Sequence, residues 1–350
     1  MNATTSTTRA TEIVLPGVVD PDGLHVRVRE LPAPGAGQVL LRMEATGVSF
    51  AEQQMRLGKY YDQPPFPFVP GYDLVGTAVA VGTGVDPLLE GRRFAAVTKV
   101  GAWASHLVVE AADLVAVPDG VDSDAAETVL VNGVTAWQMM YRTAKVERGG
   151  TIVVLGANGG VGSTLVQLAK HAGIRVIGTA SARHHDAVRA LGAIDVVDYR
   201  DPDLYARLRE LAPEGVDAVF DHVGGAGLRE SWKLLRRGGA LVNYGTAATK
   251  DEPGSGMLPV LKLFGRLMVW NALPNGRRAG FYNFWAGKRF RTATFRARLS
   301  EDLTQVLRLV GTGALRPQIA ARVPLTEAAA ALRLAESRTV LGKVVIVPQA

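Results

Sequence analysis

A regular alternation of short apolar runs with amphipathic segments, beginning at residue 151, constrains this fold more than any other feature. Runs typical of strands lie at 151–155, 175–178, 196–198, 218–221 and 240–244. Segments typical of helices lie between them, at 162–172, 185–191 and 228–235. Parallel strands require crossover connections, and these are usually helices. The alternation therefore predicts an α/β fold with a doubly wound parallel sheet that helices cover on both faces.

The first of these runs leads directly into a glycine-rich stretch, residues 156–162, which a helix follows. Glycine lets the backbone approach a pyrophosphate closely, and the first turn of a helix offers free N–H groups. A tight structural turn is the alternative, but the strand–helix context favours a dinucleotide site. The candidate residues are Gly156, Asn158, Gly159, Gly160, Val161 and Gly162.

The end of the second strand indicates which dinucleotide binds. An NAD site usually carries Asp or Glu there, about 20 residues after the glycines, for the adenosine ribose. Residues 178–185 contain hydroxyls, one arginine and two histidines, but no acid. Thr179, Ser181 and Arg183 suit a 2′-phosphate, so we predict NADPH rather than NADH. The alternative is that Arg183 and the two histidines form a solvated helix start.

Composition excludes several classes of site. The chain has no cysteine, which removes disulfides, iron–sulfur clusters and thiolate zinc sites. Its six histidines show no metal-ligand spacing, so no metal site is predicted. The N-terminus does not resemble a secretory signal, and residues 257–270 are too short and too charged to span a bilayer. We expect a soluble cytoplasmic protein, and the net charge of +6 weakly favours anionic partners, including phosphate-bearing cofactors.

The first third of the chain differs from the rest. It contains alternating strand-like runs separated by proline and glycine, which predict a small, mostly antiparallel β domain. A last strand at 342–347 has no helix after it, so we expect it to return to this domain. The expected domains are 1–128 completed by 290–350, and 129–289.

Several motifs together resemble the medium-chain dehydrogenase/reductase superfamily, in its zinc-free quinone oxidoreductase (zeta-crystallin-like) branch. They lie at 47–50, 56–60, 70–76, 132–137, 156–162, 196–200 and 337–343. The resemblance implies a GroES-like β domain plus a Rossmann domain. It also implies a homodimer that joins sheet edges, with the edge strand near 267–273.

The resemblance further implies an NADPH-dependent oxidoreductase. Without zinc there is no Lewis acid for an alkoxide, which favours hydride transfer to a quinone or an α,β-unsaturated carbonyl in the cleft between the domains. The alternatives are an enoyl-thioester (polyketide-type) ene reductase, or a non-catalytic NADPH-binding scaffold like the crystallins or vesicle proteins of the family.

Site residues follow by the same resemblance. Ser49, Tyr60 and Thr135 would lie nearest the nicotinamide, where Tyr60 would bond the substrate carbonyl or deliver a proton, unless it merely packs. Ser49 stands where this branch usually has Asn, and Glu52 and Gln54 replace the usual Asp and Tyr. The remaining cofactor residues would be Tyr199, His222, Val223, Tyr244, Gly245 and Arg338.

Residues 277–298 carry seven basic residues and no acid, with six aromatic residues interleaved. Such a segment can line a cleft between domains, with its arginines in water, or recognise an anionic or large aromatic substrate. Nucleic-acid binding is the least favoured of these interpretations.

The assignment of the phosphate pocket predicts a selective effect of Arg183→Ala. The variant should lose about tenfold or more in NADPH affinity, because a charge-assisted bond to the 2′-phosphate is removed, while NADH affinity changes little. Fluorescence titration with both dinucleotides measures this, with Arg189→Ala as the control. An equal loss for the two cofactors would contradict the assignment.

Overall fold

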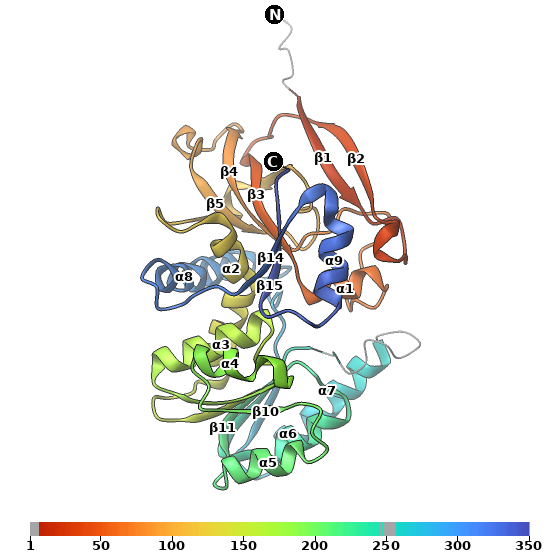
Figure 1. Cartoon of the computed structure of the whole chain (residues 1–350). Helices are drawn as coiled ribbons and strands as arrows, with labels where there is room; N and C mark the ends of the chain where they lie inside the picture. Colours follow the sequence, from red (N-terminus) through yellow and green to blue (C-terminus); the bar gives the residue numbers. More distant parts are fainter. Residues whose placement is uncertain (1–6, 246, 248–256, 350) are drawn as a thin grey trace, which may run out of the picture. The chain divides into compact units, whose positions relative to one another are not determined.

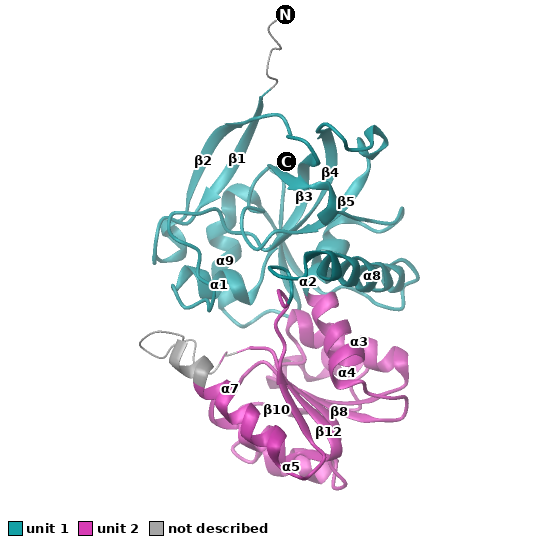
Figure 2. Cartoon of the chain, turned by 180° about the vertical axis from the view of Figure 1, so that it is seen from behind, with its two compact units in different colours: residues 1–131, 287–350 teal, residues 132–286 magenta. Residues whose placement is uncertain are grey.

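A computed structural model describes residues 7–245, 247 and 257–349. The chain divides into two compact units, shown in different colours in Figure 2. The first unit comprises residues 1–131 and 287–350, and the second comprises residues 132–286. Each unit contains its own sheet and its own hydrophobic core.

The sheet of the second unit contains, among the described residues, six strands in the order β10-β9-β8-β11-β12-β13. Every neighbouring pair is parallel. The strands are β8 (Thr151–Val154), β9 (Arg175–Ala180), β10 (Asp195–Asp198), β11 (Val216–Asp221), β12 (Leu235–Asn243) and β13 (Arg278–Phe281). The strand order reverses between β8 and β11, and this switch point is where doubly wound sheets bind ligands. The predicted doubly wound sheet is confirmed.

Helices cover both faces of this sheet. They are α3 (Gly160–Ala172), α4 (His185–Leu191), α5 (Leu204–Leu211), α6 (Leu228–Lys233) and α7 (Met257–Ala272). Figure 1 shows α3 and α4 on one face and α5, α6 and α7 on the other. The central strands are therefore buried on both sides, as Val153 and Val219 illustrate with no exposed surface. This explains why residues 152–154 of β8 and 218–220 of β11 are continuous apolar runs rather than alternating ones.

The first unit is built on a mainly antiparallel sheet in the order β14-β15-β3-β4-β5-β7, with β6 also paired to β3. Its strands are β3 (Gln38–Val48), β4 (Asp73–Val81), β5 (Arg93–Val97), β6 (His106–Glu110), β7 (Val115–Ala116), β14 (Ile319–Pro324) and β15 (Lys343–Val347). Strands β1 (Thr8–Val14) and β2 (His25–Leu31) form a separate pair. The C-terminal strand β15 pairs with β3, with Val345 opposite Gly47.

Helices and turns complete the described chain. The helices are α1 (Phe50–Arg56), α2 (Ser123–Trp137), α8 (Thr292–Gly311) and α9 (Ala328–Glu336). Residues Gln138–Ala144 continue α2 as a π-helix. Short 3-10 turns lie at Pro21–Gly23, Pro87–Leu89, Ala111–Asp113, Ala182–His184, Gly225–Gly227 and Leu325–Glu327. Across the described ranges, no helix is both long and apolar enough to cross a membrane.

The predicted position of the edge strand is wrong. Residues 267–272 belong to helix α7, and the edge strand of the second unit is β13. The apolar run Met257–Ala272 packs as a helix against β13, and a Pro-Asn-Gly turn then reverses the chain. The side chain of Asn271 bonds both backbone groups of Ala279, at 2.7 Å to the carbonyl and 2.8 Å to the N–H. This amide therefore takes the place of a further strand at that point of the edge.

Replacing Asn271 should loosen this edge. Asn271→Ala removes both bonds to Ala279, so we expect the free energy of unfolding to fall by about 1–3 kcal/mol. Amide hydrogen exchange at residues 278–281 should accelerate, because the edge strand loses its outer partner. Asn271→Asp retains an acceptor but no donor and should give an intermediate effect. Unchanged exchange in both variants would show that the amide does not secure the edge.

Candidate functional site

The glycine-rich turn after β8 is fixed by close packing. Gly156 has φ of 73°, a conformation that favours glycine. A Cβ atom at Gly156 would lie 2.3 Å from the His222 imidazole, and one at Gly162 would lie 2.2 Å from the Gly156 carbonyl oxygen. Side chains at these two positions would therefore displace the turn or the start of α3.

Gly159 is different, because its side of the turn is open. It is the N-cap of α3, and the nearest atom to a Cβ built there is the Gly156 oxygen, at 3.5 Å. The first N–H groups of a helix lack partners within the helix and carry its positive dipole end. Gly160, Val161 and Gly162 supply these groups in α3. The turn thus forms an open cradle that fits the pyrophosphate of a dinucleotide.

The loops after β11 and β12 lie at the same carboxyl edge of the sheet. His222 donates from Nδ1 to the Leu155 carbonyl (2.9 Å), which places its imidazole against Gly156. The backbone N–H of Tyr244 bonds the Asp221 carbonyl oxygen (3.0 Å). A Cβ atom at Gly245 would lie 2.6 Å from the His222 oxygen. The structure therefore brings His222, Tyr244 and Gly245 together beside the glycine turn.

Asp221 holds this edge, although sequence reasoning did not select it. One oxygen of its buried carboxylate accepts the N–H groups of Val223 and Gly224, each at 2.8 Å. The other accepts the Ser231 hydroxyl (2.8 Å). Burial raises the pKa of Asp221. The sequence signal that could have identified it is an aspartate at the end of a strand, shortly before the glycines at 224 and 225.

The predicted phosphate cluster at the end of β9 divides into two parts. Thr179 is buried, and its hydroxyl accepts the Gly156 N–H (3.0 Å), so it supports the glycine turn. The ring of His185 bonds the Ala180 carbonyl (3.2 Å), which ties α4 to the strand. Ser181 precedes the 3-10 turn that carries the exposed Arg183.

An acid does lie beside this strand end, but β10 supplies it. Asp198 accepts the backbone N–H of Arg200 (2.9 Å) and of Ala182 (3.1 Å). These bonds lower the pKa of Asp198, and the bond from the Arg200 N–H contributes most. Tyr199 beside it is half exposed, and the Arg200 guanidinium lies 5.1 Å from its ring centroid. Inspection of β9 alone missed Asp198 because the acid belongs to the neighbouring strand.

In the first unit, Ser49 begins helix α1 rather than standing free. Its hydroxyl accepts the Ala51 N–H (3.1 Å), and Glu52 accepts the Ser49 N–H (2.9 Å) and the Ser49 hydroxyl. This is a capping box, which satisfies the free N–H groups at the helix start. The replacement of Asn by Ser and of Asp by Glu thus has a local structural explanation.

Tyr60 is buried and bonded to a second tyrosine. Its hydroxyl lies 2.8 Å from that of Tyr72, and its ring centroid lies 4.6 Å from that of Tyr61. The Tyr72 N–H bonds Glu52 (2.7 Å), which links this pair to the capping box. Burial raises the pKa of Tyr60 well above its usual range. Tyr60 therefore retains its proton firmly and is suited to donating a hydrogen bond.

A buried ionic cluster lies in the same unit. The Lys343 ammonium is 3.2 Å from Asp73 and also bonds Glu127, and each side chain is at most 2% exposed. Burial raises the pKa of Glu127 to about 8. A Cβ atom at Gly47 would lie 2.5 Å from Lys343 Cε and 2.6 Å from a Glu127 carboxylate oxygen, so a side chain there would displace the ion pair. Sequence reasoning missed the cluster because its members are far apart in the chain.

Two predicted residues lie outside these groups. Thr135 is buried in α2, within the second unit. Arg338 lies between α9 and β15 in the first unit, with a left-handed φ of 57°. Within the described ranges, no group of three or more His, Asp or Glu side chains is arranged to hold a metal ion.

Comparisons with known proteins place the chain in a family. Residues 35–119 match the alcohol dehydrogenase GroES-like domain, and residues 191–346 match the zinc-binding dehydrogenase domain. The synaptic vesicle membrane protein VAT-1 homolog of Rattus norvegicus is 30% identical, over 95% of this chain and 82% of its own length. A 2-haloacrylate reductase of Burkholderia is 29% identical, over 94% of this chain and 96% of its own length.

Solved structures agree. Mycobacterial Rv1454c complexed with NADPH is 29% identical, with a TM-score of 0.81, and the match covers 97% of this chain and 100% of that one. The quinone oxidoreductase of Escherichia coli has a TM-score of 0.83 at 24% identity, over 97% of this chain and 100% of that one, and supports the fold alone. The chain therefore belongs to the medium-chain dehydrogenase/reductase superfamily, a family of oxidoreductases. This confirms the resemblance that the motifs indicated.

Removal of the buried cation should destabilise the protein strongly. Lys343→Met leaves Asp73 and Glu127 buried without their counter-charge, so we expect the free energy of unfolding to fall by about 3–5 kcal/mol. Lys233→Met, which breaks an exposed pair with Glu230, should cost less than about 1 kcal/mol. Urea denaturation of both variants measures the difference. Equal costs would show that the buried cluster contributes no more than a surface ion pair.

Proposed function

We propose that this protein is a zinc-independent, NADPH-dependent reductase that transfers hydride to a quinone or an α,β-unsaturated carbonyl. The observation that carries this proposal is the open glycine cradle at the switch point of the parallel sheet. The relatives that support it include the NADPH complex of Rv1454c and the 2-haloacrylate reductase. A cytoplasmic homodimer is part of the same proposal.

The cofactor would be held by the second unit in three places. The N–H groups at the start of α3 would bind the pyrophosphate, as helix N-termini bind anions generally. Ser181, Arg183 and Tyr199 would surround the 2′-phosphate, where Arg183 supplies positive charge. The loops that carry His222, Val223, Tyr244 and Gly245 would line the carboxyl edge of the sheet. Arg338 of the first unit is a further residue that we propose for contact with the cofactor.

When bound, NADPH supplies the hydride, and the chain's own residues then orient the acceptor. Tyr60 would donate a hydrogen bond to the acceptor oxygen, where negative charge develops. Because burial raises the pKa of Tyr60, we assign the final proton to solvent rather than to this phenol. Thr135 remains a proposed neighbour of the reacting groups. The Ser49 hydroxyl, which is engaged by Glu52, would act mainly by fixing α1.

Two alternatives have specific support. A polyketide synthase of Mycobacterium tuberculosis is 29% identical over 91% of this chain, although the match spans 14% of that protein, and it favours an enoyl-thioester acceptor. The similarity to VAT-1 homologs, together with the engaged Ser49 hydroxyl, favours a cofactor-binding scaffold without turnover.

A panel of acceptors tests these possibilities. NADPH oxidation would be followed spectroscopically with a benzoquinone, a polycyclic quinone, a short enone and an enoyl thioester, with NADH in parallel. We expect turnover on a quinone or the enone, with NADPH preferred. Turnover on the thioester alone would support an enoyl-thioester reductase. NADPH binding without turnover on any acceptor would contradict the reductase and support the scaffold.

The cradle itself predicts a variant that folds but binds poorly. Gly159→Ala should lower the unfolding free energy by only about 1 kcal/mol, because its Cβ has room and the cost is that of a poorer N-cap residue. The methyl group would stand where the pyrophosphate approaches, so NADPH affinity should fall by about tenfold or more. Gly265→Ala, whose Cβ would meet no atom within 4 Å, is the control. Unchanged NADPH affinity in Gly159→Ala would place the cofactor elsewhere.

A further inference from the structure

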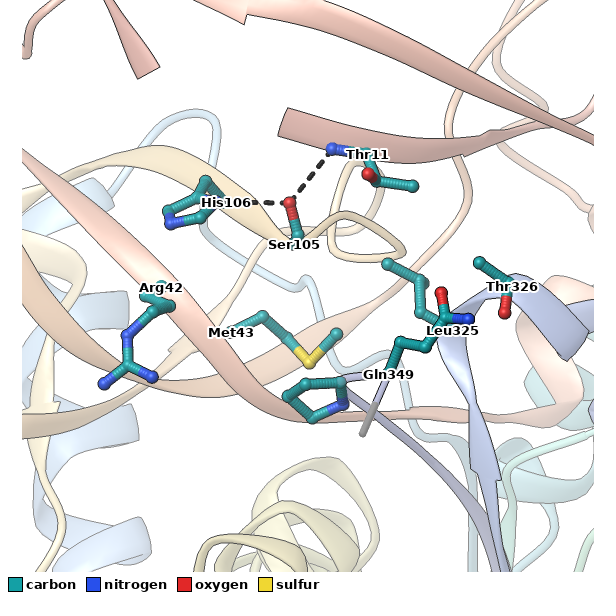
Figure 3. Close-up of a pocket in the computed structure, with 9 residues that line it drawn as sticks. Thr11, Arg42, Met43, Ser105, His106, Leu325, Thr326 and Gln349 are labelled. Atoms are coloured by element: carbon teal, nitrogen blue, oxygen red, sulfur yellow. Dashed lines mark hydrogen bonds between the residues drawn. The ribbon is translucent and has the colours of Figure 1, made fainter. Parts of the chain in front are cut away.

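A pocket of about 250 Å3 lies entirely within the first unit (Figure 3). Its walls come from β1, β3, the start of β6, the turn before α9 and the segment after β15. No residue that lines it is among those proposed for the cofactor or the acceptor. The inference drawn from it therefore does not depend on the proposed function.

Backbone bonds fix the floor of this pocket. Ser105 N–H donates to the Thr11 carbonyl (2.8 Å), and Thr11 N–H donates to the Ser105 hydroxyl (3.0 Å). The Ser105 carbonyl accepts the Met43 N–H (2.9 Å). These bonds join strands distant in the sequence, so the pocket is preformed, as small-molecule sites usually are.

One side of the pocket is positively charged. Arg42 and His106 are opposite each other in the β3–β6 register, and Figure 3 shows both on the side away from Leu325 and Thr326. Among the described residues, the Arg42 side chain makes no hydrogen bond or ion pair, although its backbone lies in the β3 ladders, and no carboxylate side chain lines the pocket. The nearest acid along β3, Glu44, feels the Arg42 charge but takes its hydrogen bonds and its ion pair from Thr77, Ser123 and Arg93. The Arg42 charge is therefore available to an anion.

The neighbouring histidine adds a second donor. The Ser105 hydroxyl accepts the Thr11 N–H and lies 3.1 Å from His106 Nδ1, to which it can donate its own proton. In the neutral tautomer that accepts this proton at Nδ1, the ring proton of His106 lies on Nε2 and can be donated. Burial and the Arg42 charge lower the pKa of His106, which extends the neutral form of the ring to lower pH. The pocket thus presents one fixed cation and one neutral donor.

The remaining walls are apolar. Met43 and Leu325 are 1% and 3% exposed, and the Pro348 ring lies beside them. The volume equals that of about eight waters, which is enough for a compact organic molecule. We propose that this pocket binds a small carboxylate with a compact aromatic or branched body, its carboxylate on Arg42 and His106 and its body against Met43 and Leu325.

Isothermal titration of the full-length protein tests the site, with benzoate as the probe. Benzamide has the same shape without charge, and inorganic phosphate has charge without an apolar body. We expect saturable binding of benzoate, with benzamide and phosphate each weaker by about tenfold or more, because each lacks one of the two interactions. Phosphate binding as tightly as benzoate would overturn the proposed ligand class.

Two variants locate the binding. Arg42→Gln should weaken benzoate by about tenfold, since a charge-assisted bond becomes a neutral one. Arg92→Gln changes an exposed arginine outside the pocket and should leave binding unchanged. Thr326→Trp, which fills the pocket from its rim, should abolish binding while NADPH binding and oxidation stay at the wild-type level. Absence of benzoate binding, or binding that neither Arg42→Gln nor Thr326→Trp alters, would overturn the proposal.

Discussion

The contact between the Gly156 turn and the His222 imidazole is the constraint on which the candidate cofactor site depends. It joins the ends of β8 and β11, the two strands between which the sheet order reverses. With a side chain at Gly156, the glycine turn and the His222 imidazole could not both keep their positions. Asp221 and Thr179 reinforce the arrangement by bonding the backbone of the adjoining loops. The open side at Gly159 follows from this packing, because only the inner face of the turn is filled.

The first unit depends on a different interaction, an ionic cluster removed from water. Lys343 on the C-terminal strand is held by Asp73 on β4 and Glu127 on α2. Such a cluster costs desolvation, and its members are tolerated only while they remain paired. It therefore fixes the register of β15 against β3 and, through Asp73, the position of the adjacent Tyr72. Glu52 bonds the Tyr72 N–H, so the Tyr72–Tyr60 pair and the Ser49–Glu52 capping box are connected to the residue beside Asp73.

These contacts change the chemical roles proposed for Ser49 and Tyr60. By resemblance, Ser49 and Tyr60 were expected beside the nicotinamide, with Tyr60 bonding the substrate carbonyl or delivering a proton. The Ser49 hydroxyl is engaged in a capping box. Burial raises the pKa of Tyr60, so this phenol is a weaker acid than an exposed tyrosine. A hydrogen-bond donor that keeps its proton suits an acceptor whose charge is delocalised, as in a quinone or an enone. The requirement for a strong acid at the site is correspondingly small.

The sequence by itself determined the parallel sheet, because both faces of β8 and β11 are buried and their central residues, 152–154 and 218–220, are continuously apolar. It also identified the glycine turn, since local backbone requirements are written in consecutive residues. The tertiary structure decided the rest. Asp198 reaches the end of β9 from the next strand, Asn271 occupies the sheet edge that was expected at 267–273, and Lys343 meets carboxylates 270 and 216 positions away. Such contacts join residues with no common periodicity, so only the folded chain brings their charges and hydrogen bonds together.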